Sequence, residues 1–364
     1  MMAEEPVLRV KLFRSARAFE TAADETVLDA ALRAELDVPH RCMAGNCGLC
    51  RARLLEGEVA YPDGRPLGLS DAESADGLVL LCRAHAHSDL LLDMLAPGSA
   101  GALRVKRLPC RVERSERLAH DVMGVYLRLP PAERFDFEPG QYIDILLSNG
   151  RRRSFSIASP PHDARPLELH VRRTPGGEFS EQIFAEDMRG ALLQLEGPLG
   201  NSVFRDSAWA PGADAPVAAA PPLLLVGGGT GLAPLKRIVR HVLEQGLPRR
   251  MTLYWGVRAE RDLYAHAFLE AMARADPRLR YIPVLSEPSP AWEGRRGFVH
   301  QAALADVDRL ESHEIHASGP PQMIEAMRRD FTARGVPESA MSFDSFDYAP
   351  DSPARQSMRA ETRS

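Results

Sequence analysis

Four cysteines constrain the fold of this chain more than any other residues. Three share one short loop, separated by four and then two residues, and 31 further residues separate the third from the fourth: Cys42, Cys47, Cys50 and Cys82. Thiolates spaced in this way can meet at one centre if the loop curls around it. Gly45 and Gly48 suit such a loop, because glycine tolerates tight or positive-φ conformations that bring the backbone close to a bound group.

The spacing matches that of plant-type [2Fe–2S] ligands. A structural zinc site is the alternative, although zinc ligands usually come as two short cysteine pairs, and here the set is three plus one. Disulfides are less favoured, because the acidic N-terminus lacks the apolar run of a secretory signal and a reducing cytoplasm is expected. The sequence therefore predicts that all four cysteines ligate an iron–sulfur cluster.

Length and composition indicate an ordinary globular protein of about two to three domains. The apolar share is 45% and the charged share 26%, both typical of soluble domains. No stretch approaches the roughly 20 apolar residues that a membrane span needs. We expect a cytoplasmic protein with no membrane partner.

Charge is distributed unevenly along the chain. The net charge is −5, which does not favour nucleic acid as a partner, and residues 1–100 hold ten Lys/Arg against 16 Asp/Glu. The acidic excess therefore lies on the segment that carries the four cysteines. It could orient a weakly bound electron-transfer partner, and a solvated acidic surface explains it equally well.

Residues 1–96 follow the order of a β-grasp ferredoxin, an α+β fold. A strand pair over residues 7–20 precedes a capped helix from Thr26, the cysteine loop, a further strand, a short helix near Ser70–Ala75 and a strand that delivers Cys82. The small residues at 97–102 predict a linker.

Residues 103–207 predict a small antiparallel β-barrel, because short strands alternate with Pro and Gly turns. The expected strands are 103–112, 122–129, 142–147, 154–157, 167–171 and 192–195. The fifth cysteine, Cys110, falls in the first of them and is interpreted as a small buried residue.

Residues 223–346 alternate strands and helices, which predicts a doubly wound parallel sheet. An Ala- and Pro-rich connection over 208–222 precedes this domain. The polar, aperiodic tail at 347–364 is expected to be disordered.

The first strand of that sheet runs into a glycine-rich turn at Gly228, Gly229, Thr230 and Gly231. Such a turn lets a pyrophosphate approach the backbone, and the next helix offers its N–H groups. The third glycine of the dinucleotide fingerprint is replaced by Pro234, and the absence of Gly-Lys-Ser/Thr disfavours a P-loop. Taken alone, the run indicates either a dinucleotide site or merely a tight turn.

Taken together, the motifs resemble the ferredoxin-NADP reductase superfamily. The matching segments are Arg153-Ser-Phe-Ser156, Leu169-His-Val-Arg-Arg173 with Gly176, Gly177 and Ser180, Gly228-Gly-Thr-Gly-Leu-Ala-Pro234, and Ala317-Ser-Gly-Pro-Pro321. With a plant-type ferredoxin first, residues 7–346 resemble the single-chain NADH-dependent reductases that supply bacterial oxygenases. Among these, the chain looks like reductases of the CDP-6-deoxyglucoseen and phenol hydroxylase type.

The resemblance implies an FAD site on the barrel. Arg153 would neutralise the FAD pyrophosphate, Phe155 would pack on the cofactor, and the Ser156 hydroxyl would lie near the hydride-accepting flavin atom. Gly177 and Ser180 would open a helix whose N–H groups take the same pyrophosphate. The full implied set is Arg153, Phe155, Ser156, His170, Val171, Arg172, Gly177 and Ser180.

The resemblance likewise implies a nicotinamide site on the parallel sheet. Its residues would be Gly228, Gly229, Thr230, Gly231, Ser318, Gly319 and Pro320, with Phe346 as the candidate aromatic that shields the flavin. Ser318 stands where the family often has cysteine. NADH is favoured over NADPH, although Arg258 and Arg261 could meet a 2′-phosphate or could be surface residues.

These roles imply an enzyme that moves electrons from NADH through FAD to a [2Fe–2S] cluster and on to a protein acceptor. The implied acceptor is an oxygenase component, or alternatively a deoxysugar dehydratase, and the protein is expected to be a monomer. No protein acid or base is required. A non-catalytic nucleotide sensor stabilised by zinc is the alternative from another class.

Overall fold

The computed structural model describes residues 7–15, 17–22, 24–36, 38, 40, 45, 48, 50–62, 64–66, 68–94, 105–163, 166–200, 203–204 and 220–346. The chain forms two compact units, Met1–Arg104 and Val105–Ser364. The predicted linker at 97–102, most of that at 208–222 and the tail at 347–364 lie outside the described residues. None of the described helices is both long and apolar enough to span a membrane.

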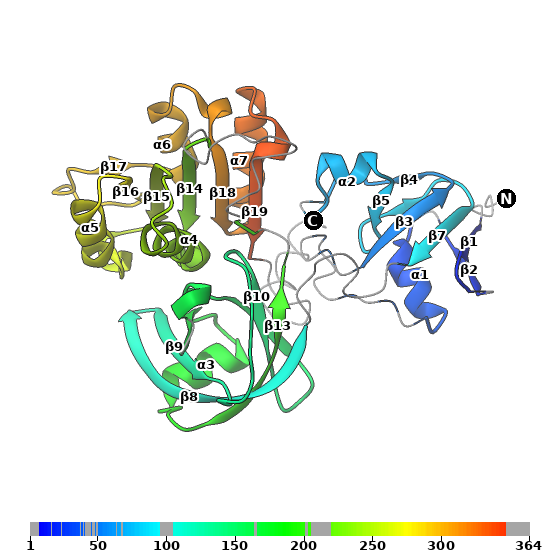
Figure 1. Cartoon of the computed structure of the whole chain (residues 1–364), viewed down its shortest axis with the longest axis horizontal. Coiled ribbons are helices and arrows are strands. Elements are labelled where there is room, and N and C mark those ends of the chain that lie inside the picture. Colours follow the sequence, from blue (N-terminus) through cyan, green and yellow to red (C-terminus); the bar gives the residue numbers. More distant parts are fainter. Residues whose placement is uncertain are drawn as a thin grey trace. The chain divides into compact units, whose positions relative to one another are not determined.

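The first unit contains a five-stranded sheet in the order β2-β1-β7-β3-β5, which confirms the predicted β-grasp fold (Figure 1). Neighbouring strands of this sheet are antiparallel, except that β1 and β7 are parallel. The strands are β1 (Leu8–Leu12), β2 (Ala18–Thr21), β3 (Arg51–Glu56), β5 (Leu78–Leu80) and β7 (Leu90–Met94), and a separate pair joins β4 (Val59–Ala60) to β6 (His85–Ala86).

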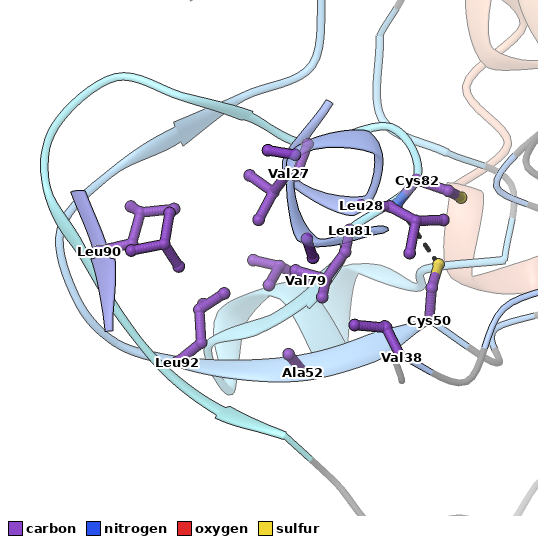
Figure 2. Close-up of a cluster of buried hydrophobic side chains, with 14 of the residues drawn as sticks. Val27, Leu28, Val38, Cys50, Ala52, Val79, Leu81, Cys82, Leu90 and Leu92 are labelled. Atoms are coloured by element: carbon purple, nitrogen blue, oxygen red, sulfur yellow. Dashed lines mark hydrogen bonds between the residues drawn. The ribbon is translucent and has the colours of Figure 1, made fainter. Parts of the chain in front are cut away.

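Helix α1 (Val27–Arg33) supplies much of the core of this unit. The Thr26 side chain caps it by accepting a hydrogen bond from the Asp29 N–H. Val27 and Leu28 are fully buried against sheet residues such as Leu92 (Figure 2). The short helix α2 (Asp71–Ala75) lies where a helix was predicted and begins with a capping box at Ser70.

The second unit begins with a six-stranded antiparallel sheet in the order β11-β10-β13-β8-β9-β12. An antiparallel bridge between Ile157 and Leu169 joins its two edges and closes the predicted barrel. The strands are β8 (Lys106–Ala119), β9 (Val122–Arg128), β10 (Tyr142–Leu146), β11 (Arg152–Ser156), β12 (Leu167–Arg172) and β13 (Leu192–Leu199), with helix α3 (Glu178–Ala185) between the last two.

Cys110 lies in β8 and is buried in the barrel core, as predicted. Burial raises the pKa of its thiol to about 12. Such a thiol stays protonated at neutral pH and is unsuited to metal binding.

The second sheet of this unit is entirely parallel, in the order β17-β16-β15-β14-β18-β19, which confirms the doubly wound prediction. Helices α4 and α5 lie on one side of it and α6 and α7 on the other (Figure 1). The strands are β14 (Leu223–Gly228), β15 (Met251–Val257), β16 (Leu279–Leu285), β17 (Arg295–Arg296), β18 (Glu314–Gly319) and β19 (Met341–Ser345), and the helices are α4 (Leu232–Glu244), α5 (His266–Ala275), α6 (Val299–Asp306) and α7 (Pro321–Ala333).

The chain reverses its winding direction between β14 and β18, because β15 lies on one side of β14 and β18 on the other. In open parallel sheets, ligands bind outside the carboxyl ends of the strands at such a switch point. The glycine-rich turn that follows β14 and the Ser318–Pro320 segment at the end of β18 therefore lie where a ligand site is expected.

Candidate functional site

Cys50 and Cys82 lie together at one end of the core of the first unit (Figure 2). They are only 2% and 4% exposed, and the Cys82 N–H donates a hydrogen bond to Cys50 Sγ over 3.4 Å. Backbone N–H donors aimed at sulfur are what a thiolate-bound cluster requires. The other two predicted ligands, Cys42 and Cys47, lie outside the described residues.

The two loop glycines adopt the conformations that the sequence predicted. Gly45 has φ +80° and Gly48 has φ +68°. A Cβ on Gly45 would lie 2.5 Å from Pro66 Cβ and 2.8 Å from Arg83 Cγ, so a side chain there would force the loop apart. Two buried thiols lie together, and the loop beside them has conformations at Gly45 and Gly48 that favour glycine. Both features fit a bound iron–sulfur cluster.

The predicted flavin segment on β11 presents its residues on both faces of the strand. Phe155 packs against Phe179 of α3, with ring centres 5.4 Å apart. Ser156 is 9% exposed, and its Oγ donates to Asp344 Oδ2 over 3.0 Å. Arg153 is half-buried, and its Nη1 donates to the Arg152 carbonyl.

Gly177 and Ser180 lie at the start of α3, as predicted, with Gly177 as the N-cap. Ser180 Oγ accepts from the Thr174 N–H and contacts the Gly177 carbonyl at 3.0 Å, so this hydroxyl holds the preceding turn together. A Cβ on Gly177 would lie 2.6 Å from Ser180 Oγ. No side chain of the described residues caps α3, so its first N–H groups are available to a pyrophosphate.

The residues of β12 contribute differently from what their motif suggests. Val171 is fully buried in the barrel core. His170 is 6% exposed and contacts Tyr264 Oη at 2.9 Å through Nδ1 and Glu168 Oε1 at 3.0 Å through Nε2. Burial lowers the pKa of His170, so the neutral ring donates from Nε2 to Glu168 and accepts from Tyr264. Val171 can therefore meet a cofactor only through its backbone.

Arg172, the last residue of β12, links the barrel to the glycine-rich turn. Its Nε donates to Asp121 Oδ2 over 2.8 Å. Its Nη1 lies 2.9 Å from the position that a Cβ on Gly229 would occupy. Gly229 itself has φ +57° and its carbonyl accepts from Trp255 Nε1.

The glycine-rich turn packs tightly against the end of β18. A Cβ on Gly231 would lie 2.0 Å from the Ser318 carbonyl oxygen, and one on Gly228 would lie 2.6 Å from Met323 Sδ. Gly231 is also the N-cap of α4, which no side chain of the described residues caps. Thr230 is half-buried between these glycines. The turn thus leaves its backbone and the start of α4 to a phosphate-bearing ligand.

Asp344 brings the two halves of the site together. Its Oδ2 accepts hydrogen bonds from Ser156 Oγ at 3.0 Å and from Ser318 Oγ at 3.2 Å. Ser318 is 1% exposed and pairs directly with Asp344 in the parallel register of β18 and β19. Sequence reasoning missed Asp344, because nothing in the residues around it marks their strand as a neighbour of Ser318.

The remaining predicted residues flank this position. The Phe346 N–H donates to the Gly319 carbonyl over 2.9 Å, and its side chain is half-buried. Pro320 is the N-cap of α7. The residues that fit FAD and nicotinamide nucleotide therefore line adjoining segments of the second unit.

Three family models match consecutive parts of the chain. They describe a 2Fe-2S iron-sulfur cluster binding domain over residues 10–87, an oxidoreductase FAD-binding domain over 109–204 and an oxidoreductase NAD-binding domain over 225–329. Each model coincides with one of the three sheets that carry the residues described above.

Similar proteins share the whole arrangement. The CDP-6-deoxy-L-threo-D-glycero-4-hexulose-3-dehydrase reductase of Yersinia pestis is 35% identical over 93% of this chain and 98% of its own length. Reductase component 2 of terephthalate 1,2-dioxygenase from a Comamonas species is 32% identical over 92% and 95%. The crystal structure of the Amycolatopsis cytochrome P450 reductase GcoB matches with a TM-score of 0.67 and 33% identity, covering 93% of this chain and 98% of that one.

These matches cover nearly the full length of this chain and of each similar protein. The three family models match the same three sheets that carry the candidate cofactor residues. The electron path implied by the motifs therefore holds: NAD(P)H to FAD to [2Fe–2S] to a redox protein partner. The chain belongs to the single-chain ferredoxin–FAD–NAD(P)H reductases of the ferredoxin-NADP reductase superfamily.

Proposed function

We propose that this protein is a monomeric, NADH-dependent reductase that delivers electrons one at a time to the terminal component of a multicomponent oxygenase. The observation that carries the proposal is the convergence of Ser156 and Ser318 on one carboxylate, that of Asp344. Ser156 belongs to the barrel and Ser318 to the parallel sheet. The Asp344 carboxylate thus holds both hydroxyls: that of Ser156, proposed to lie near the flavin, and that of Ser318, proposed to lie near the nicotinamide.

The cofactors supply the redox chemistry when bound: hydride donation by nicotinamide, conversion of two-electron to one-electron steps by flavin, and one-electron transfer by the cluster. The protein binds and aligns them. We propose that Arg153 and the start of α3 hold the FAD pyrophosphate, that Phe155 packs on the cofactor and that residues 228–231 receive the nucleotide pyrophosphate. The four cysteines hold the cluster.

Both serine hydroxyls donate their protons to Asp344, so their lone pairs remain available to the ligands beside them. Because two donors share one carboxylate oxygen, neither hydroxyl can rotate without losing a charge-assisted hydrogen bond. The arrangement thus fixes the orientation of both hydroxyls before nucleotide binds, which favours rapid hydride transfer.

A direct test uses two artificial acceptors with the purified holoenzyme. We expect a visible flavin and iron–sulfur spectrum and steady NADH oxidation with either ferricyanide or cytochrome c. Cys82→Ser should abolish cytochrome c reduction while ferricyanide reduction persists, because only the first requires the cluster. Cys110→Ala is the matched control and should retain both activities. A colourless protein after reconstitution, or no NADH oxidation, would show a nucleotide sensor instead.

The acceptor requires a second test. An oxygenase component is proposed first, as for the Comamonas relative, and a dehydrase of a nucleotide-linked deoxysugar is the second candidate because the Yersinia relative is 35% identical over 93% of the chain. Each candidate acceptor is mixed with the reductase and NADH, and product formation is measured against a mixture lacking the reductase. The true acceptor should couple NADH oxidation to product, and the other should not.

A further inference from the structure

Three side chains that could bind a metal ion meet away from the cofactor residues. His120 and Asp121 form the turn between β8 and β9 of the barrel, and Asp262 ends the short 3₁₀ turn Glu260–Asp262 that follows β15. His120 Nδ1 lies 3.4 Å from Asp262 Oδ1 and 3.9 Å from Asp121 Oδ1. All three ligand atoms lie within 4.8 Å of one another.

The two carboxylate oxygens that face His120 are buried without a hydrogen bond. Neither Asp121 Oδ1 nor Asp262 Oδ1 accepts one within the described part of the chain. The Asp262 side chain is only 8% exposed. Buried carboxylate oxygens are nearly always satisfied, so a pair of orphaned ones aimed at one imidazole calls for an ion.

The opposite oxygen of each carboxylate is firmly held. Asp121 Oδ2 accepts from Arg172 Nε over 2.8 Å, and Asp262 Oδ2 accepts from the Ala259 N–H over 3.0 Å. These bonds fix the direction in which each free oxygen points. Ligands oriented by such outer partners are the usual construction of a protein metal site.

Two cationic side chains near Asp121 and Asp262 offer another explanation for the unbonded carboxylate oxygens. A protonated His120 could form an ion pair with both carboxylates, yet its Nδ1 makes no hydrogen bond to either oxygen. Arg261 Nε lies 3.8 Å from Asp262 Oδ1, but this side chain is 76% exposed and free to turn into solvent. Neither cation satisfies the two oxygens as a directly coordinated ion would.

We propose that His120, Asp121 and Asp262 form a binding site for a divalent first-row cation, Mn²⁺ or Zn²⁺. One imidazole nitrogen with two carboxylate oxygens suits these ions better than Ca²⁺ or Mg²⁺, which prefer oxygen alone. Metal–ligand bonds of about 2.0–2.2 Å require ligand atoms roughly as close as those observed. The half-exposed side of His120 leaves room for water ligands.

The site would join the barrel to the parallel sheet beside the nucleotide-binding turn. Asp121 is bonded to Arg172, and the guanidinium of Arg172 lies against Gly229. An ion that fixes Asp121 would therefore also fix Arg172. By linkage, nucleotide binding and ion binding should strengthen each other.

The experiment measures Mn²⁺ uptake by the full-length holoenzyme from the loss of the free-ion EPR signal. We expect one Mn²⁺ per chain, displaced by Zn²⁺, and binding at least ~10-fold weaker in His120→Ala and Asp262→Asn. Mn²⁺ should raise the unfolding temperature of the wild type and of neither variant. Asp163→Asn is the matched control, because Asp163, in the 3₁₀ turn Pro161–Asp163, pairs with Arg240 of α4 away from His120, Asp121 and Asp262. This variant should bind Mn²⁺ normally.

Equal Mn²⁺ uptake by the wild type and His120→Ala would overturn the proposal. It would also be overturned if chelation left the unfolding temperature of the wild type unchanged while acidification through the imidazole range raised it. That second outcome would show that His120, Asp121 and Asp262 form a proton-dependent ion pair. His120 is half-exposed, so His120→Ala should fold and give a clear reading.

Discussion

Ser156 donates a hydrogen bond to Asp344 over 3.0 Å although 188 residues separate them in the chain. The same carboxylate oxygen accepts from Ser318 over 3.2 Å. The last strand of the parallel sheet therefore completes a site that begins on the barrel. This contact links the two cofactor-binding sheets where hydride transfer is proposed to occur.

Replacing Asp344 with alanine should slow flavin reduction by NADH about tenfold. Both serine hydroxyls would lose their shared acceptor, worth about 1.5–3 kcal/mol for a charged partner, and would turn away from the ligands. Stopped-flow absorbance at the flavin band measures the rate. Asp308→Ala, an exposed change in the turn after α6, is the control. Equal rates in the two variants would show that Asp344 does not align the site.

Gly231→Ala should weaken nucleotide binding through a steric clash alone. The added Cβ would lie 2.0 Å from the Ser318 carbonyl oxygen, so the ends of β14 and β18 would be pushed apart. We expect a KM for NADH at least tenfold higher and a lower unfolding temperature. Gly246→Ala is the control for NADH binding only, because its Cβ meets no atom within 4 Å, whereas its φ of +67° strains an alanine and lowers stability. If both variants bind NADH alike, the packing of the turn is unimportant.

Glu168 should make the second unit sensitive to acid. Burial alone would raise its pKa, but the hydrogen bond from His170 and the charge of Lys236 at 2.6 Å outweigh burial and hold the pKa at about 2. The folded pKa is below the unfolded value, so this stabilisation is present above about pH 4.5 and disappears as the pH falls towards 2.

The test compares the wild type with Glu168→Gln by urea unfolding, followed by tryptophan fluorescence. All three tryptophans lie between residues 209 and 292, so the signal reports the second unit. The wild type should be more stable by a few kcal/mol at pH 7, and the difference should shrink as pH falls from about 4.5 to 2. A constant difference over that range would refute an ionised Glu168.

Arg237→Met should stabilise the protein. The Arg237 side chain is fully buried in α4, and none of its nitrogens has a hydrogen-bond partner within the described part of the chain. Burial lowers its pKa to about 9, and the Asp344 carboxylate offsets only part of this effect. An apolar side chain of similar volume removes the cost of burying hydrogen-bond donors without partners, which is about 1–3 kcal/mol.

The same variant predicts a specific pH dependence. The unfolded chain holds the Arg237 proton more tightly than the folded chain, so wild-type stability should rise between pH 9 and 12.5 relative to Arg237→Met. Urea unfolding at pH 7 and pH 10 measures the change. Arg250→Met, an exposed substitution, should show no difference at either pH. A destabilised Arg237→Met would mean that the charge has an unseen partner.

The architecture was predictable because its signals are local. Short strands broken by Pro and Gly turns identified the barrel, and the alternation of strands with helices identified the parallel sheet. The prediction was incomplete where local signals were weak. Strand β8 extends to Ala119, beyond the predicted end at residue 112, because pairing with β9 stabilises a stretch rich in charged residues. Strand β19 was missed because its five residues show no strong strand pattern and depend on pairing with β18.

The motif residues were found because their spacing is distinctive, but their contacts depend on register and packing. Asp344 meets Ser318 only because β19 pairs parallel to β18 in one particular register. His170 lies within a flavin motif, yet its ring is committed to Tyr264 and Glu168. Neither fact can be read from residue types or spacing, because both depend on strands that are distant in the chain.

The position of Asp344 on an edge strand also sets an order of events during biosynthesis. The ribosome must complete Met341–Ser345 before this strand can add to β18, whereas the barrel and most of the parallel sheet are made earlier. Until then Ser156 and Ser318 lack their shared acceptor, so the contact that joins the barrel to the parallel sheet is among the last to form on the nascent chain.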